Sequence, residues 1–474
     1  MVKGILYSLL ARASFVISAY AMHMLLARVM GPAEYGSFGI LISLLTVCYI
    51  FTNNGVKQQA SQLIAIYPEA DGSILARLVK IQFLISLAIA VILVSISSYL
   101  ANIFHDERLQ VPLCVCAIVI IFQAATSVYA GALNGRRHFG RESLLGVFQA
   151  VARAGFTVVG AFLISDARLA GAMYGYLIFA LVTLVISWRI GRGTGSQPLE
   201  LSHKQIFGSS FAIVAAFGFL TLCRSLDLMV VKAKLPATEA GFYAVASSAS
   251  QIAFHILLSF GLVCFPYAAK HFHENDHSAI RKLLEDSLKF ALLLLVPIVV
   301  CFTIFGEQVI TFLFGSQYLP AAPLLETLIW GMFSFGIFFV FAQFLLAANR
   351  RRELVWTTTI VFALTAILNV LLVDRFGAIG AAFSTTISGS VASLYCIAIF
   401  VRDYKLRLHK VASIAFLTAL SLWAASALDS VGINLIVSAL VISITFLIGV
   451  GALKVMTIDE GKRLVRAFLE RRTS

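Results

Sequence analysis

Residues 28–36 read Arg-Val-Met-Gly-Pro-Ala-Glu-Tyr-Gly, and residues 232–241 read Lys-Ala-Lys-Leu-Pro-Ala-Thr-Glu-Ala-Gly. Both stretches run from a basic residue through Pro-Ala and Glu to a Gly, and the second has one inserted residue. Each stretch separates two long apolar segments, and proline and glycine end or bend helices. The sequence therefore predicts the same helix–turn–helix unit at two places in the chain.

Two further pairs of matching segments follow in the same order. Asn134-Gly-Arg-Arg corresponds to Asn349-Arg-Arg-Arg, and Leu169-Ala-Gly-Ala corresponds to Ile379-Gly-Ala-Ala. In each case six apolar segments separate the two copies. Because six is even, the two copies have the same orientation in a membrane and are related by an axis along its normal. Parallel repeats of this kind are typical of transporters that bind substrate between the halves.

The composition is that of a membrane protein. Of the 474 residues, 60% are hydrophobic and 12% are charged, with a mean hydropathy of +0.93. Soluble proteins carry about 25% charged residues, and disordered chains are still more polar. Both classes are therefore excluded.

Apolar segments long enough to cross a bilayer account for most of the chain. A spanning helix needs about 20 mostly apolar residues. About fourteen segments qualify: 7–29, 37–56, 81–101, 110–133, 143–165, 170–188, 208–231, 241–265, 288–305, 323–347, 355–373, 378–400, 411–428 and 432–454. The first has no A-x-A-like site after it, so we expect a retained helix and not a cleaved signal. The segments between the spans leave no room for a soluble catalytic domain.

We therefore expect an all-α polytopic membrane protein with two parallel-repeat six-helix lobes around a central cavity, plus two C-terminal helices. The expected boundaries are residues 1–190 for the first lobe and 191–207 for a cytoplasmic linker. Residues 208–402 form the second lobe, and 403–474 hold the last two spans and a basic tail.

The distribution of the basic residues that produce the net charge of +13 indicates the membrane topology. With the N-terminus inside, 27 of the 36 Lys and Arg residues fall in inner segments, which predicts cytoplasmic N- and C-termini. Six basic residues are expected in outer loops: Arg28, Arg108, Arg168, Lys232, Lys234 and Arg375. Because the inner residues are spread over many short segments, no nucleic-acid-binding face is expected.

Ionisable side chains inside spans are the candidate substrate-binding residues, because they are costly in lipid and usually face a cavity. These residues are Arg12, His23, Arg153, Arg224 and Asp227. His23 and Asp227 each lie nine residues before the proline of their repeat. The excess of arginine predicts an anion-binding lumen, since guanidinium groups bind phosphate through paired hydrogen bonds.

Each of these residues also has a simpler interpretation. Arg224 and Asp227 lie three residues apart on one helix, so they can neutralise each other and fix helix packing. Arg12 can extend its charge to the cytoplasmic interface. Arg153 lies in the middle of a span and has no acidic residue near it in the sequence.

Metal, nucleotide and redox sites are not indicated. The seven cysteines lie in apolar segments and form no CxxC pair, which is typical of packing residues. His271, His273 and His277 fit a solvated inner loop better than a metal site. No GxxxxGK[ST], GxSxG or HExxH motif occurs, so we expect neither a cofactor, a nucleotide nor an enzymatic activity.

The segments 26–38 and 54–60, with Ala132-Leu-Asn-Gly-Arg136 and Gly377-Ala-Ile-Gly-Ala-Ala382, resemble bacterial polysaccharide (O-antigen type) flippases. This family belongs to the multidrug/oligosaccharidyl-lipid/polysaccharide (MOP) exporter superfamily, and the resemblance covers most of the first twelve spans. It implies alternating access and an undecaprenyl-pyrophosphate-linked oligosaccharide as cargo. It also implies the bacterial inner membrane as location, and a polysaccharide polymerase and chain-length machinery as partners.

Two alternatives stay open. One is an ion-coupled multidrug or small-molecule exporter of the same superfamily, which would favour cavity carboxylates, whereas this chain has one clear mid-span acid. The other is a lipid II type flippase, which the two additional C-terminal spans resemble. A membrane glycosyltransferase or polymerase is disfavoured because no large extramembrane loop is present.

Overall fold

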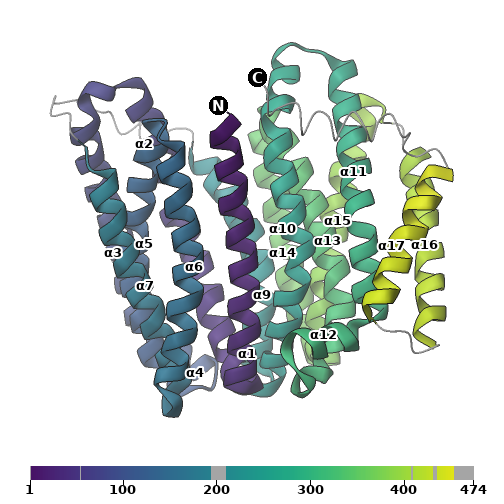
Figure 1. The fold of residues 1–474 in the computed structure, drawn as a ribbon, viewed down its shortest axis with the longest axis horizontal. Helices are drawn as coiled ribbons and strands as arrows, with labels where there is room; N and C mark the ends of the chain where they lie inside the picture. The colour runs from purple at the N-terminus through teal and green to yellow at the C-terminus, as the bar shows by residue number, and fades with distance from the viewer. Residues whose placement is uncertain (1, 54, 194–209, 407–408, 431–434, 453–474) are drawn as a thin grey trace. The chain divides into compact units, whose positions relative to one another are not determined.

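The computed structural model describes residues 2–53, 55–193, 210–406, 409–430 and 435–452 (Figure 1). Helices joined by short turns make up these parts of the chain, and no strand occurs among them, which confirms the all-α fold. The α-helices are α1 (Val2–Asn53), α2 (Gly55–Ile66), α3 (Asp71–Ser95), α4 (Ser97–Ile103), α5 (Gln110–Gly135), α6 (Phe139–Leu163), α7 (Arg168–Gly191), α9 (Ser210–Lys234), α10 (Ala237–His273), α11 (His277–Ile304), α12 (Gly306–Phe314), α13 (Ala322–Ala347), α14 (Arg351–Phe376), α15 (Ala378–Tyr404), α16 (His409–Ser430) and α17 (Leu435–Ala452).

Most predicted spans lie on a single helix. The span 81–101 runs from α3 into α4 and the span 37–56 ends in α2, while parts of 208–231 and 432–454 lie outside the described residues. Within the described residues, eleven helices are long and apolar enough to cross a membrane, and one of them, α1, holds the first predicted span and most of the second. Helices α16 and α17 contribute the shorter apolar stretches Ser413–Leu428 and Val437–Val450. The chain is thus a multi-pass membrane protein, whereas the count of fourteen spans stays a prediction.

Some helices begin well before their apolar segment. Helix α11 begins at His277, where a span was expected from residue 288, because the Asp276 carboxylate accepts hydrogen bonds from the backbone N–H groups of Ser278 and Ala279. Such a cap stabilises the first turn of a helix whether or not its residues are apolar. Hydropathy therefore locates the part of a helix that lies in lipid and not the end of the helix.

The predicted turn of the first repeat is a sharp kink in α1. Gly31 has φ 75° and ψ 171°, and Pro32 follows it. A positive φ favours glycine, and proline lacks the N–H that a continuous helix needs. The Arg168 guanidinium donates a hydrogen bond to the carbonyl of Val29, just before the kink. Helix α1 is therefore two helical segments joined at a fixed bend.

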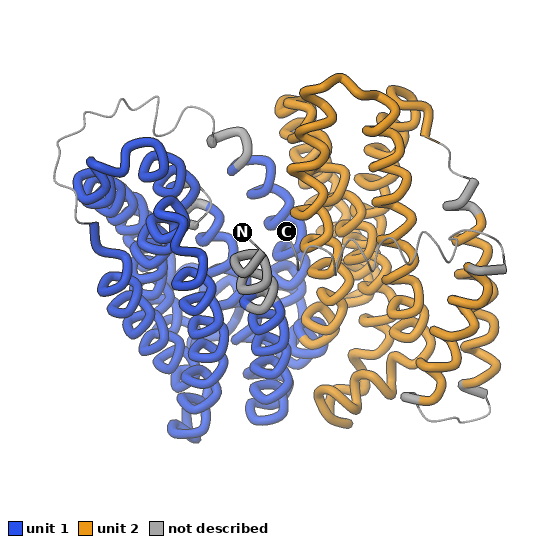
Figure 2. The backbone as a smooth tube through the Cα atoms, turned by 45° about the horizontal axis from the view of Figure 1, so that its top comes forward, with its two compact units in different colours: residues 1–244 blue, residues 245–474 orange. Residues whose placement is uncertain are grey.

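The chain divides into two compact units, one up to residue 244 and one from residue 245 onward (Figure 2). This division lies within α10, and all five candidate binding residues belong to the first unit. Residues 194–207 of the predicted linker and 453–474 of the predicted basic tail lie outside the described residues. The lobe boundaries at 190 and 208 stay predictions.

Helix α1 is the central element of the first unit. It packs against α6 and α9, and also against α5 and α7 (Figure 1). Helices α6 and α7 form a close pair, because a methyl group at Gly160, Gly171 or Gly175 would overlap the backbone of the other helix. Small residues allow this approach in membrane helices, where dispersion contacts and not water exclusion drive association.

Replacing Gly175 by Ala is expected to destabilise the first unit by about 1–3 kcal/mol, because the added methyl group would overlap the Phe156 carbonyl and overpack the pair. The matched control is Gly155→Ala on α6, where a methyl group meets nothing within 4 Å. The control should be neutral or slightly stabilising, since alanine favours helices over glycine. Melting temperatures of the purified variants in detergent measure the difference, and equal values would contradict the close packing described here.

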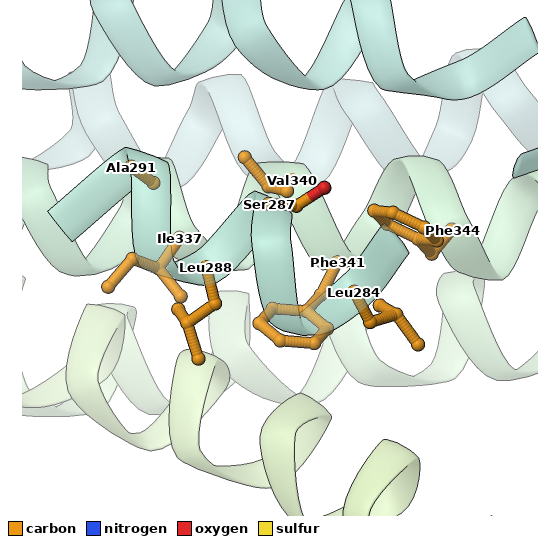
Figure 3. A pocket seen from close by; sticks show the side chains of 8 residues that line it. All are labelled: Leu284, Ser287, Leu288, Ala291, Ile337, Val340, Phe341 and Phe344. Carbon is orange, nitrogen blue, oxygen red and sulfur yellow. The ribbon is translucent and has the colours of Figure 1, made fainter. Parts of the chain in front are cut away.

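In the second unit, α13 lies at the centre and packs against α11 and α15, while α16 packs against α11 and α17. Phe338, Phe341 and Phe344 of α13 are buried. A small apolar gap of about 10 Å³ lies between α11 and α13, with Leu288, Phe341 and Ser287 in its lining (Figure 3). Its volume is at most that of one water molecule, so it is a packing gap and no binding site.

The structure brings the first pair of repeated stretches together. A methyl group at Gly36 would lie 2.7 Å from the backbone nitrogen of Gly241, and one at Gly241 would overlap Pro32. The glycines that end the two copies therefore meet at the closest approach of α1 and α10.

The second pair has a register that differs from the sequence match. The prediction pairs Asn134 with Asn349. In the structure, Asn349 corresponds instead to Arg137, because both residues adopt the left-handed backbone conformation, with φ 59° at Asn349 and φ 60° at Arg137. The backbone hydrogen bonds agree, since the N–H of Arg137 bonds to the carbonyl of Asn134 and that of Asn349 to Leu346. The match is three residues out of register, because the turn depends on backbone geometry that asparagine and arginine can both adopt.

Candidate functional site

Helix α1 contributes two of the predicted residues, Arg12 and His23. Arg12 lies on the helix, but its side chain is outside the described part of the structure. The neighbouring Phe15 contacts Arg153 of α6, whose guanidinium carbon lies 4.4 Å from the centre of the Phe15 ring. This cation–π contact places Arg153 beside the first segment of α1.

The guanidinium of Arg153 has unused hydrogen-bonding capacity. Its Nε and one terminal nitrogen are buried and have no hydrogen-bond partner among the described residues. The same holds for the buried hydroxyl group of Tyr20 on α1. Tyr49, also on α1, lies close to the charge of Arg153 and to the Tyr176 hydroxyl, with which it interacts. The two Arg153 nitrogens and the Tyr20 hydroxyl can donate hydrogen bonds, and leaving buried donors unsatisfied costs free energy. A ligand rich in acceptor oxygens would satisfy them.

Arg224 and Asp227 are neighbours on α9. Arg224 interacts electrostatically with Asp227 and with Tyr20. Asp227 is fully buried, and its carboxylate accepts hydrogen bonds of 2.7 Å from the Tyr243 hydroxyl and from the backbone N–H of Leu228. The pair is therefore held in place on the side of α9, with Tyr20 linking it to α1.

His23 and Asp227 have similar surroundings. The His23 ring nitrogen Nδ1 lies 2.9 Å from the Tyr35 hydroxyl, and the Tyr243 hydroxyl donates to Asp227, although the two tyrosines do not occupy matching positions in the repeat. Both tyrosines are almost fully buried and follow the proline of their repeat. The sequence analysis identified the two ionisable residues and missed their tyrosine partners, although Tyr35 is part of the repeated stretch.

The structure corrects the predicted position of Lys232. This lysine was expected in an outer loop, but it lies in the last turn of α9 and its side chain is 1% exposed. Its Nζ donates to the Asp106 carboxylate at 3.1 Å and to the Ser37 hydroxyl at 3.0 Å, and Ser37 donates to Asp106 at 2.5 Å. Arg108 completes this group with a 2.9 Å hydrogen bond from its Nε to Asp106. We call these four residues the Asp106 cluster.

The Asp106 carboxylate is ionised throughout the physiological range. Burial acts to raise its pKa, but the hydrogen bonds from Arg108, Ser37 and Lys232 outweigh it and lower the pKa to about 2. Sequence reasoning missed this residue because its partners lie 69 and 126 positions away along the chain.

The loop histidines show no metal-site geometry. His271 lies 3.7 Å from the Glu274 carboxylate, and the His277 ring packs beside Tyr404. Over the described ranges, no group of three His, Cys, Asp or Glu residues is placed to hold a metal ion.

An open pocket of about 320 Å³ lies beside the α1 kink. It is lined by residues 30–34, Ser165, Arg168 and Thr238. Its only charged lining residues are Glu34 and Arg168, so its charges are balanced, unlike the donor-rich surroundings of Arg153.

Known proteins share this fold and part of the sequence. The probable low-salt glycan biosynthesis flippase Agl15 of Haloferax volcanii is 23% identical over 372 residues, which cover 77% of this chain and 76% of that protein. The lipid II flippase MurJ of Bacillus subtilis is 23% identical over 59% of this chain and 57% of its own length.

A structure of lipid II flippase MurJ in an inward closed conformation superposes with a TM-score of 0.78 at 17% identity, covering 95% of this chain and 98% of that one. An inward-facing multidrug transporter of the MATE family, in the MOP superfamily, gives 0.69 at 13% identity, covering 84% of this chain and 98% of that one. The polysaccharide biosynthesis protein family matches residues 25–323. Because this match spans more than half of the sequence, the chain belongs to the polysaccharide biosynthesis protein family, and its fold is that of the MOP superfamily.

Proposed function

We propose that this protein is a flippase that moves a polyprenyl-pyrophosphate-linked oligosaccharide across the membrane by alternating access. The cargo would be the repeat unit of an O-antigen, an exopolysaccharide or a capsule. The pyrophosphate would be bound by Arg12, Arg153 and Arg224, with His23 and Asp227 nearby, while the polyprenyl chain stays in lipid.

The observation that carries this proposal is the set of unsatisfied donors around α1. Arg153 offers two buried N–H-bearing nitrogens and Tyr20 offers a hydroxyl group, none of which has a hydrogen-bond partner among the described residues. Pyrophosphate and sugar hydroxyls supply many acceptor oxygens, and arginine binds phosphate through charge-assisted hydrogen bonds. A buried cationic donor therefore suits the head group of such a lipid.

The surroundings of Asp227 disfavour the alternative of a drug exporter. Cationic drugs need carboxylates in the cavity, and the one candidate carboxylate, Asp227, already lies beside Arg224 and accepts a hydrogen bond from Tyr243. A lipid II type flippase stays the second candidate, because lipid II also carries a polyprenyl pyrophosphate and the MurJ fold extends over more of this chain than the MATE fold does.

Several linked features belong to the same proposal. Residues 1–190 and 208–402 would form two lobes around the cavity, and the protein would lie in the bacterial inner membrane with both termini in the cytoplasm. A polymerase and chain-length machinery would use the product on the outer side. No nucleotide is needed in the chain, so an ion gradient or the membrane potential would supply the energy.

Purified protein in liposomes tests the proposal directly. Three kinds of vesicle are compared, containing a fluorescent polyprenyl-pyrophosphate oligosaccharide, fluorescent lipid II or a cationic dye. Quenching with a membrane-impermeant reductant measures movement of the two lipids, and efflux measures transport of the dye. We expect movement of the oligosaccharide lipid and no dye transport. Movement of lipid II alone would assign the second candidate, and dye transport alone would contradict a flippase function.

A further inference from the structure

The Asp106 cluster joins three segments at one end of the first unit. Ser37 lies on the second segment of α1, Asp106 lies in the turn between α4 and α5, and Lys232 is in the last turn of α9. The first two segments belong to the first sequence repeat, and α9 opens the second. The cluster therefore connects the two repeats through a buried ion pair.

The ion pair is closed to solvent and fully bonded. The side chains of Lys232 and Asp106 are 1% and 4% exposed, and Ser37 bonds to both. Arg108 is half exposed and covers the carboxylate, and it also lies 3.9 Å from Glu34. Among the described residues, Arg108 and Lys232 are the charged groups bonded to Asp106, and Glu34 lies beside Arg108. A buried pair of this kind is costly to break, because each partner would be left as an uncompensated charge.

A second, independent contact lies beside the cluster. Gly36, next to Ser37, meets Gly241 at a distance that leaves no room for a side chain, and a side chain at Gly39 would press against Leu228 of α9. The backbones of the two repeats are thus in contact along the same end where the ion pair lies. Topology prediction from the charge distribution puts this end on the outer side.

We propose that the Asp106 cluster is a latch that holds the outer end of the α1–α9 contact closed, and that it must open for the cargo to leave. The inference rests on the proposed flippase function for the alternating access and for the cargo, and on the predicted topology for the outer side. Alternating access requires the two repeats to separate at one end while the other closes. The cluster would serve as the two-state element that such a transition needs, closed when its hydrogen bonds are formed and open when they are broken.

Protonation does not open this latch under physiological conditions. The Asp106 carboxylate has a lowered pKa, so the interaction is fully present above the unfolded value of about 4 and is lost only as the pH falls through about 2. Opening must therefore come from movement of the helices or from competition for the charges, for which a pyrophosphate is suited because it can replace the carboxylate as the partner of Lys232.

Cysteine accessibility tests the latch without any substrate. Leu228 is 5% exposed and faces Gly39 across the contact, so Leu228→Cys reports opening when the seven native cysteines are replaced by alanine. The labelling rate with a membrane-impermeant maleimide is measured in sealed vesicles. In this background, Asp106→Asn/Lys232→Met removes both charges and leaves no buried ion. We expect it to raise the labelling rate by about tenfold or more, through a shift toward the open state.

The matched control is Lys270→Met, which breaks an exposed pair with Glu274 and should leave the rate unchanged. Ser37→Ala removes one hydroxyl and should raise the rate by a smaller factor, which keeps the test decisive if the charge variants do not accumulate. Unchanged labelling in the double variant and in Ser37→Ala, at normal protein levels, overturns the latch. Because no cargo is present, this result is independent of the transport assay, and each proposal can fail alone.

Discussion

Arg153→Ala should abolish most transport while the protein still accumulates in the membrane. The side chain contributes buried donors that have no protein partner in the described chain, so its removal breaks no ion pair and leaves no lone charge. If the pyrophosphate binds there, loss of a desolvated charge-assisted contact costs about 2–4 kcal/mol, or about 30- to 1,000-fold in affinity. Titration of the fluorescent oligosaccharide lipid against the purified variant measures this change.

Two further variants separate binding from packing at this position. Arg153→Lys keeps the charge and loses the planar fork, so it should restore part of the affinity only. Arg141→Ala, in the exposed first turn of the same helix, should bind like the wild type. Arg153→Ala with wild-type affinity and transport would contradict the role of Arg153 and, with it, the cationic lumen.

The Arg224–Asp227 pair carries the second large expected effect. Asp227→Ala should lower the melting temperature strongly, because it leaves Arg224 in a buried environment without its carboxylate and leaves the Tyr243 hydroxyl without an acceptor. Removing one partner of a buried ion pair costs about 3–5 kcal/mol. Melting of the purified variant in detergent, compared with Glu274→Ala at an exposed pair with Lys270, measures the loss.

The double variant Arg224→Met/Asp227→Leu distinguishes the two interpretations of this pair. Replacing both charges by apolar groups of similar volume should recover most of the stability. We expect the double variant to be stable and unable to transport the oligosaccharide lipid, as a binding role for Arg224 requires. A stable variant with normal transport would show that the pair serves packing alone.

Much of the fold could be predicted from local sequence. The kink at Gly31-Pro32 depends on residues that dictate their own backbone conformation, and long apolar segments form helices in lipid regardless of their neighbours. In the third repeat match, Gly171 and Gly380 both approach the backbone of the preceding helix, although the predicted match pairs Gly171 with Ala381 and is therefore one residue out of register. The predicted alignment of the second pair of repeated segments was wrong at Asn349, because side-chain identity does not determine which residue adopts the left-handed backbone conformation of the turn.

The candidate site was less predictable for a different reason. That Arg153, Arg224 and Asp227 lie in spans follows from composition. Whether each has a partner depends on side chains from other helices, such as Phe15 beside Arg153 and Tyr243 bonded to Asp227. Lys232 shows the same limit: at the end of an apolar segment it has the sequence pattern of a loop residue, yet Asp106 lies beside it in the fold.

The sequence by itself determined that this chain is an all-helical membrane protein with an excess of cationic residues inside its spans, and it predicts a duplicated core. These properties depend on hydropathy, proline and glycine, which act over a few residues. Only the tertiary structure decided which buried charges are neutralised and which donors stay free, because electrostatic and hydrogen-bond partners meet across helices. That distinction makes Arg153 the leading candidate for substrate binding and the Asp106 cluster a candidate latch.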